Sequence, residues 1–166
     1  MMRSYKHTLY MDAMPGRSKA GRPTGNFRAW LQQMKDNDIT TVVCLAPDAD
    51  IAAESPQYAA WRAKQKSAGA SAGYKRIDVP IPDYSIPGPT DVARFWTTAA
   101  DVAKRIEAGE RIFVHCGAGI GRTGMFLVAV LMQQGMSYED AYAEIAAVGS
   151  HPETAQQVAF LKRGAS

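Results

Sequence analysis

The chain has 166 residues, of which 46% are hydrophobic, and this is enough for one globular domain with its own core. Its formal net charge of +3 is too small to predict binding to nucleic acid or to a membrane surface. The two cysteines exclude the disulfide framework of small secreted domains and favour a reducing compartment. Because the start of the chain also lacks the apolar run of a signal peptide, we expect residues 1–166 to form a single cytoplasmic domain and a monomer.

Hydrophobic patterns along the chain predict strands that alternate with helices. In chain order these are a helix at 27–34, strands at 40–45 and 77–81, a helix at 92–106, a strand at 111–115 and helices at 125–131 and 137–149. This alternation predicts an α/β fold with a central, mainly parallel sheet of about four to five strands flanked by helices on both faces. In such sheets, ligands bind at the carboxyl ends of the strands.

Capping residues predict where several helices begin and end. Thr90 can cap the helix at 92–106, and Gly109 can end it. Near the end of the chain, Ser150 and Glu153 have the spacing of a capping box, which predicts the start of a last helix.

The segment from Ile112 to Gly124 carries the strongest functional pattern, because a buried strand runs through a glycine-rich turn into an apolar helix. Its glycines let the backbone turn tightly with N–H groups pointing inward, and the helix that follows adds the positive end of its dipole. Such a loop can hold a phosphate group. The residues expected to bind phosphate are Gly117, Ala118, Gly119, Ile120, Gly121 and Arg122.

Four side chains in this segment are of the types that phosphate chemistry needs. Arg122 can bind two phosphate oxygens at once through its planar guanidinium group. Cys116 lies at the bottom of the loop, where the same N–H groups would hold a thiolate nucleophile. Thr123 can donate a hydrogen bond to that sulfur, and His115 is expected to support the loop through backbone contacts.

The order His115-Cys116, five residues, Arg122-Thr123 resembles the signature of the cysteine-dependent protein tyrosine phosphatase superfamily. The order of the segments along the chain is similar to that of its small dual-specificity branch, which includes kinase-associated phosphatase. The resemblance implies a dual-specificity phosphatase-like sheet flanked by helices. It also implies hydrolysis of a phosphorylated protein through a phosphocysteine intermediate at Cys116, with no cofactor.

By the same resemblance, Asp83 is the general acid and base. It follows the strand at 77–81 and enters a loop stiffened by prolines, as the corresponding Asp of the family does. In that role Asp83 would protonate the leaving oxygen and then, as a carboxylate, activate the hydrolytic water. Two alternatives stay open: Asp78 could be the acid, or Asp83 could be a turn residue beside Pro82.

The substrate class is less constrained by the sequence. The resemblance favours phosphotyrosine, but the chain has no room for long recognition insertions, so phosphoserine and phosphothreonine stay open. Gly117 and Ile120 stand where related phosphoinositide phosphatases often carry lysines, which disfavours inositol lipids. A phosphoinositide, an RNA 5′ phosphate or phosphate binding without turnover remain alternatives, although Asp83 argues against the last because a binder needs no acid.

Three further residues have open interpretations. Glu153 stands where many family members have a Gln that positions water, so a Gln-type role is not expected, and Gln157 is expected on the helix surface or in a hydrogen bond that braces a loop. Cys44 could face the same sheet edge as Cys116 and form a reversible disulfide, or it could be a small apolar core residue.

Two expectations concern charge and metals. Basic residues near the start of the chain could frame the site, or they could form a solvated basic surface; these are Arg3, Lys6, Arg17, Lys19 and Arg22. The three histidines and two cysteines are not at the spacing of metal ligands, so no metal site is expected.

Overall fold

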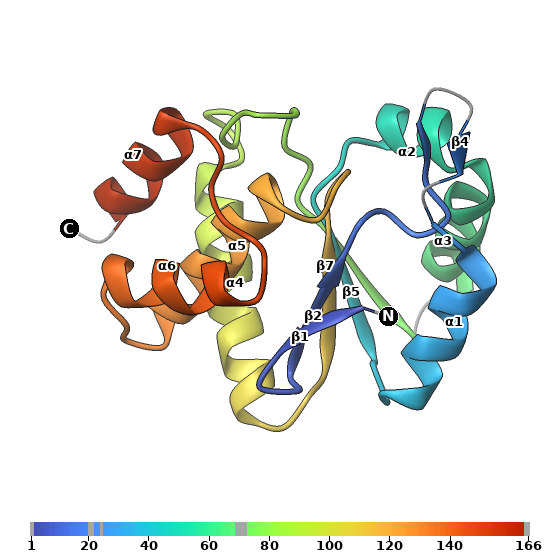
Figure 1. Ribbon diagram of the computed structural model, residues 1–166, viewed down its shortest axis with the longest axis horizontal. Coiled ribbons are helices and arrows are strands. Elements are labelled where there is room, and N and C mark those ends of the chain that lie inside the picture. The colour runs from blue at the N-terminus through green and yellow to red at the C-terminus, as the bar shows by residue number, and fades with distance from the viewer. Residues whose placement is uncertain (1, 20–21, 24, 69–72, 165–166) are drawn as a thin grey trace.

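The computed structural model describes residues 2–19, 22–23, 25–68 and 73–164 and has the predicted α/β fold (Figure 1). The five-stranded main sheet has the order β1-β2-β7-β5-β6. Its strands are β1 (Arg3–Tyr5), β2 (Leu9–Asp12), β5 (Thr41–Cys44), β6 (Lys75–Asp78) and β7 (Ile112–His115). A second, two-stranded sheet consists of β3 (Ser18–Lys19) and β4 (Arg22–Pro23).

The main sheet is parallel except at one edge, where β1 pairs antiparallel with β2. The central strands β5 and β7 are buried along their whole length, as their apolar and β-branched residues predict. In the register of the sheet, His115 lies opposite Asp12 on one side and Cys44 on the other. Strands β2, β5 and β7 therefore end at the same edge of the sheet, and Cys116 follows directly after β7.

Helices cover both faces of the sheet, as predicted (Figure 1). They are α1 (Phe27–Asp36), α2 (Asp48–Glu54), α3 (Pro56–Ala68), α4 (Val92–Glu107), α5 (Gly121–Gln133), α6 (Tyr138–Ala147) and α7 (Ala155–Gly164). Helices α1 to α3 lie on one side and α4 to α7 on the other. Each side has its own hydrophobic cluster, because alternate strand residues point to opposite faces: Val43 joins one cluster, and Val42 and Cys44 join the other.

Helix α5 is the central element of the α4 to α7 side, and every residue from Gly121 to Leu131 is buried. Its sequence is apolar on all sides, which suits a helix that contacts α4, α6 and α7 together. At Gly124 the chain around His151 passes so close that a Cβ atom would lie 2.3 Å from the His151 nitrogen. Glycine at this position therefore allows the segment before α7 to cross the start of α5.

Several predicted boundaries were wrong by a few residues. The strand predicted at 77–81 lies at Lys75–Asp78, although the N–H groups of Val79 and Ile81 still donate to carbonyls at the end of β5. The N-cap of α4 is Asp91, which makes no side-chain capping bond, and not Thr90. Gly109 does end α4, with a φ of +90° that favours glycine.

The capping box predicted at Ser150 and Glu153 was also wrong. Helix α7 begins at Ala155, where Thr154 Oγ1 accepts a hydrogen bond from the Gln157 N–H at 3.1 Å. The side chain of Gln157 reaches back to the Thr154 N–H at 3.4 Å. The capping box thus exists four positions later than predicted, because Ser150 is instead buried against the glycine-rich loop.

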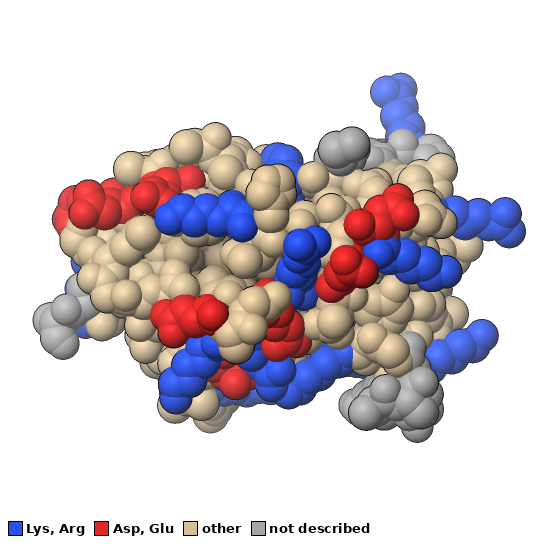
Figure 2. Space-filling model, turned by 90° about the horizontal axis from the view of Figure 1, so that it is seen from below, with Lys and Arg blue, Asp and Glu red and all other residues tan. Residues whose placement is uncertain are grey.

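The surface of the molecule is mixed in charge on the face seen from below in Figure 1. Lys and Arg side chains are interspersed there with Asp and Glu (Figure 2). Across the described residues, we find no helix with both the length and the apolar composition needed to cross a membrane.

Candidate active site

The glycine-rich loop leaves β7 after His115 and enters α5 at Gly121. Gly119 has a φ of +75°, and a Cβ atom there would lie 2.3 Å from the carbonyl of Asp12, so only glycine fits. The Met14 N–H donates to the Gly117 carbonyl at 2.8 Å. The Gly119 carbonyl accepts bonds from Arg3 Nη2 and Ser150 Oγ, both at 2.7 Å.

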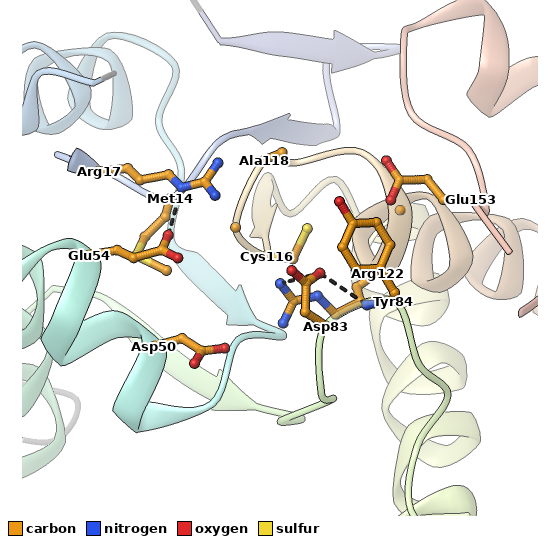
Figure 3. Close-up of a pocket in the computed structure, with 12 residues that line it drawn as sticks. Met14, Arg17, Asp50, Glu54, Asp83, Tyr84, Cys116, Ala118, Arg122 and Glu153 are labelled. Carbon is orange, nitrogen blue, oxygen red and sulfur yellow. Dashed lines mark hydrogen bonds and ion pairs between the residues drawn. The ribbon is translucent and has the colours of Figure 1, made fainter. Parts of the chain in front are cut away.

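These contacts hold the loop carbonyls from outside the loop. Anions can then be bound by loop N–H groups together with the positive end of α5, which begins within the loop. A cavity of about 90 Å³ lies over this loop and has room for a group of the size of phosphate rather than for a drug-sized ligand (Figure 3). Its lining residues are Met14, Arg17, Asp50, Glu54, Asp83, Tyr84, Cys116, Gly117, Ala118, Gly121, Arg122 and Glu153.

Cys116 lies at the bottom of this pocket and is 3% exposed. Its sulfur accepts a hydrogen bond from Thr123 Oγ1 at 3.2 Å, the contact that the sequence predicts. Thr123 is itself fully buried in the first turn of α5. A sulfur in this position faces the space where a phosphorus atom would lie above the loop.

Arg122 brings its guanidinium group into the same pocket, and its side chain is 4% exposed. Nη1 donates to the Ile81 carbonyl at 2.9 Å, and Nη2 lies 3.1 Å from Asp83 Oδ1. Nε is buried and has no hydrogen-bond partner among the described residues. Nε and Nη2 share one edge of the guanidinium group, so this edge can bind two oxygens of an oxyanion.

Asp83 lies at the mouth of the pocket with 60% of its side chain exposed. Its Oδ1 atom also accepts the N–H of Tyr84, which has a φ of +58°. The loop that carries Asp83 is braced by Gln157, whose Nε2 donates to the Ser85 carbonyl at 3.0 Å. The loop-bracing role predicted for Gln157 is therefore confirmed.

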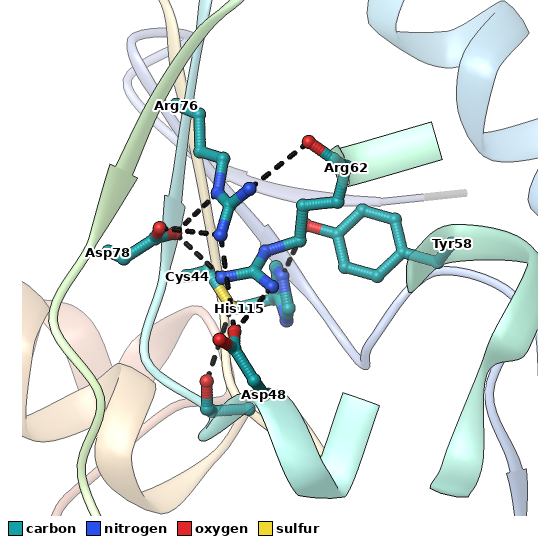
Figure 4. A network of polar contacts seen from close by, with 8 residues as sticks. Cys44, Asp48, Tyr58, Arg62, Arg76, Asp78 and His115 are labelled. Atoms are coloured by element: carbon teal, nitrogen blue, oxygen red, sulfur yellow. Dashed lines mark hydrogen bonds and ion pairs between the residues drawn. The ribbon is translucent and has the colours of Figure 1, made fainter. Parts of the chain in front are cut away.

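Asp78, the rival acid, lies outside the pocket on the edge strand β6. Its carboxylate is bound by Arg62 Nη2 at 2.8 Å and by Arg76 Nη2 at 2.8 Å (Figure 4). Burial alone would raise the pKa of Asp78, but hydrogen bonds from Arg76 and the charge and hydrogen bonds of Arg62 lower it overall. A carboxylate held in this way has no proton to give to a substrate in the pocket.

His115 supports the loop from below, where it is fully buried. Nδ1 lies 2.9 Å from the Cys116 carbonyl, and Nε2 lies 2.7 Å from the hydroxyl of Tyr58 (Figure 4). Burial lowers the pKa of His115 to about 4, so the ring is neutral near pH 7. Because a carbonyl only accepts, Nδ1 carries the proton and Nε2 accepts from Tyr58, a partner that the sequence did not reveal.

The facing arrangement that a disulfide needs is not present. Both cysteines are free, and they belong to different core clusters, one on each face of the sheet. Cys44 lies opposite His115 in the register, and its thiol donates to the Ala46 carbonyl at 3.6 Å. Burial raises the pKa of the Cys44 thiol to about 11, which fits the alternative of a core residue.

The rim of the pocket contains charged residues that the sequence pattern did not bring together. Arg17 lines the pocket, with Nε bound to Glu54 Oε2 at 2.6 Å, so one of the basic residues near the start does frame the site. Arg3 instead braces the loop through Gly119. Asp50 and Glu54 were missed, because they come from α2, which carries no motif.

Comparison with known proteins gives a family and a fold. Residues 14–136 match the family described as "Polymorphic toxin system, DSP-PTPase phosphatase". Mouse protein tyrosine phosphatase type IVA 2 is 30% identical over 91 residues, which are 55% of this chain and 54% of the relative. The chain thus matches about half the length of this curated relative.

Two solved structures show the same fold. Kinase-associated phosphatase with its catalytic-site cysteine substituted by serine has a TM-score of 0.77 at 16% identity, covering 94% of this chain and 84% of that chain. PTPMT1 in complex with PI(5)P has a TM-score of 0.70 at 19% identity, covering 95% and 89%. At these identities the likeness concerns the fold.

Proposed function

This chain belongs to the DSP-PTPase phosphatase family of polymorphic toxin systems, and on this premise we propose that it hydrolyses phosphotyrosine in proteins through a phosphocysteine at Cys116. Phosphoserine and phosphothreonine form a second class of substrate. The observation that carries the proposal is one pocket that contains the Cys116 sulfur and the Arg122 guanidinium group from one segment and the Asp83 carboxyl group from another (Figure 3).

In the first step the substrate phosphate binds to the loop N–H groups and to the Nε and Nη2 edge of Arg122. The Cys116 thiolate attacks phosphorus, so that an S–P bond forms and the bond to the tyrosine oxygen breaks. Asp83 donates its proton to that oxygen as it leaves. Its exposed place at the pocket mouth suits this role, because the leaving group departs toward solvent.

In the second step water hydrolyses the phosphocysteine. The Asp83 carboxylate takes a proton from the water, whose oxygen attacks phosphorus while the S–P bond breaks. Thr123 stabilises the departing thiolate through its hydrogen bond to the sulfur. Inorganic phosphate and the starting form of the enzyme result.

The covalent step is tested by replacing each cysteine in turn. We expect Cys116→Ser to abolish turnover of a phosphotyrosine peptide while peptide binding persists, because Arg122 and the loop donors remain. The matched control, Cys44→Ser, lies on the other face of the sheet and should keep both activity and binding. Acid quenching with a ³²P-labelled substrate should trap labelled protein in the control and none in Cys116→Ser. Turnover by Cys116→Ser within about tenfold of the parent contradicts the covalent mechanism.

A further inference from the structure

The mouth of the pocket has the opposite charge to the chain as a whole. The net charge of the chain is +3, and basic and acidic side chains are interspersed on the face in Figure 2. Among the described residues that line the pocket, the cations are Arg17 and Arg122, and the carboxylates are Asp50, Glu54, Asp83 and Glu153. The lining is therefore acidic even before a phosphate dianion enters.

Two of these carboxylates already have a cation beside them. Glu54 is bound to Arg17 at 2.6 Å, and Asp83 lies 3.1 Å from Arg122. The buried Nε of Arg122, which has no hydrogen-bond partner within the described part of the chain, still points to an anion as the ligand at the bottom of the pocket. One substrate must therefore place a phosphate group at the bottom of the pocket and also fit an acidic rim.

The remaining two carboxylates, Asp50 and Glu153, have no hydrogen-bond or ion-pair partner among the described residues. They lie on either side of Cys116, Asp50 on α2 and Glu153 on the segment before α7 (Figure 3). Glu153 reaches the loop itself, because a Cβ atom on Gly121 would lie 2.7 Å from its Oε2 atom. Two uncompensated negative charges thus flank the place where phosphate would bind.

A phosphate dianion beside these carboxylates is repelled unless the substrate brings its own positive charge. We propose that Asp50 and Glu153 bind basic side chains on the two sides of the phosphorylated residue, so that the preferred substrate is a phosphopeptide flanked by Lys or Arg. This selectivity rests on the proposed phosphatase function and specifies its substrate class. Phosphoinositides and RNA 5′ ends fit the rim less well, because they add negative charge.

The selectivity is tested with three phosphotyrosine peptides that differ only in the residues on both sides of the phosphotyrosine: Lys and Arg, Ala, or Glu. For the parent we expect kcat/KM to be about tenfold higher for the basic than for the acidic peptide at low salt, and nearly equal at about 0.5 M salt. Asp50→Asn and Glu153→Gln should each reduce this ratio by about threefold, and together bring it close to one.

The matched control is Glu107→Gln, which removes the same charge from an exposed position at the end of α4, outside the pocket lining. It should keep the parental ratio. The inference is overturned if the three peptides react equally at low salt, if the double variant keeps the preference, or if phosphoinositide vesicles or RNA with a 5′ phosphate react faster than the basic peptide. Failure of the parent to hydrolyse any of these substrates contradicts the proposed phosphatase function itself.

Discussion

At the scale of single residues, Asp83 and Arg122 form a contact at the pocket in which the proposed reaction takes place. Nη2 of Arg122 lies 3.1 Å from Asp83 Oδ1, on the edge of the guanidinium group that also carries the buried Nε. Nη2 carries two N–H groups, so it can bind a phosphate oxygen together with Nε while it stays beside Asp83. The contact keeps the Asp83 carboxyl group next to the place of the bound phosphate, where the proposed mechanism uses it first as acid and then as base.

The role of Asp83 predicts a defect that depends on the leaving group. Asp83→Asn keeps the shape of the side chain but removes the transferable proton. For a phenyl phosphate with a poor leaving group, kcat should fall by roughly 10² to 10⁴ while KM changes little. The defect should shrink for a leaving group of low pKa, which needs little protonation. Rates for a series of aryl phosphates, measured on both proteins, check this expectation.

Asp78→Asn is the control for that series. Asp78 is bound to Arg62 and Arg76 outside the pocket, so its variant should keep the dependence on the leaving group that the parent shows. If kcat of Asp83→Asn falls equally for good and poor leaving groups, Asp83 is not the general acid. The same follows if Asp78→Asn, and not Asp83→Asn, shows the larger defect for poor leaving groups.

At the scale of elements, the loop that carries Asp83 is joined to α7 by one buried side chain. Gln157 donates to the Ser85 carbonyl at 3.0 Å, and its Oε1 atom accepts the Glu153 N–H at 2.8 Å. The same residue completes the capping box with Thr154. Gln157 therefore fixes the acid loop on one side and the segment of Glu153 on the other.

Gln157→Ala should leave Cys116, Thr123 and Arg122 in place but loosen the acid loop. We expect kcat for a poor leaving group to fall by about tenfold, with a much smaller loss for a good leaving group, because proton donation depends on the position of Asp83. Gln156→Ala, at the neighbouring exposed position, is the control and should behave like the parent. A loss in Gln157→Ala that is equal for both leaving groups, or that follows only its thermal stability, contradicts a positioning role.

The sequence predicted those elements whose pattern is local. Strands β5 and β7 are continuous β-branched and apolar runs, and α4 has an apolar residue at every third or fourth position. The edge strand β1 and the helices α2 and α3 were not predicted, because β1 has three residues and α2 has seven. Helix α3 is held by tertiary aromatic contacts, such as that of Tyr58 with Trp30, whose ring centroids lie 5.5 Å apart.

The same distinction between local and tertiary patterns applies to the pocket. Cys116, Arg122 and Thr123 belong to one contiguous motif, and the structure places all three where the sequence expects them. Asp50 and Glu54 reach the pocket only because α2 follows the carboxyl end of β5, beside the loop. Residues that the fold brings together from distant parts of the chain have no fixed spacing in the sequence, so a motif search cannot find them.

At the scale of the whole molecule, the buried His115 makes the free energy of unfolding depend on pH. Burial lowers the pKa of His115 from 6.5 to about 4. Between these values the unfolded chain binds a proton that the folded chain does not bind, so the free energy of unfolding falls as the pH drops through this window. The full effect is of the order of 3 kcal/mol, complete below pH 4 and absent above about pH 7.

Urea unfolding of the parent at pH 7 and at pH 4.5 measures this loss, and His115→Asn is the comparison. We expect the Asn variant to be less stable at pH 7, because the bond to Tyr58 is lost. It should lose much less stability on acidification, since Asn does not titrate. Asp78 and Glu110, whose pKa values are lowered, lose their stabilising effect as the pH falls below their ordinary values of 3.8 and 4.5, so at pH 4.5 only the start of the Glu110 loss is added, and it is added in both proteins. An equal loss in both proteins would place the titrating group elsewhere.

The bonds that hold the Gly119 carbonyl also bear on the order in which the chain folds. Arg3 donates to this carbonyl from 116 residues away, and Ser150 donates to it from 31 residues away on the other side. Loops that enclose so many residues close slowly compared with the formation of single helices. A chain whose helices have formed but whose two ends have not docked lacks both of these bonds to the loop. Recovery of activity during refolding should therefore lag behind the recovery of helix content.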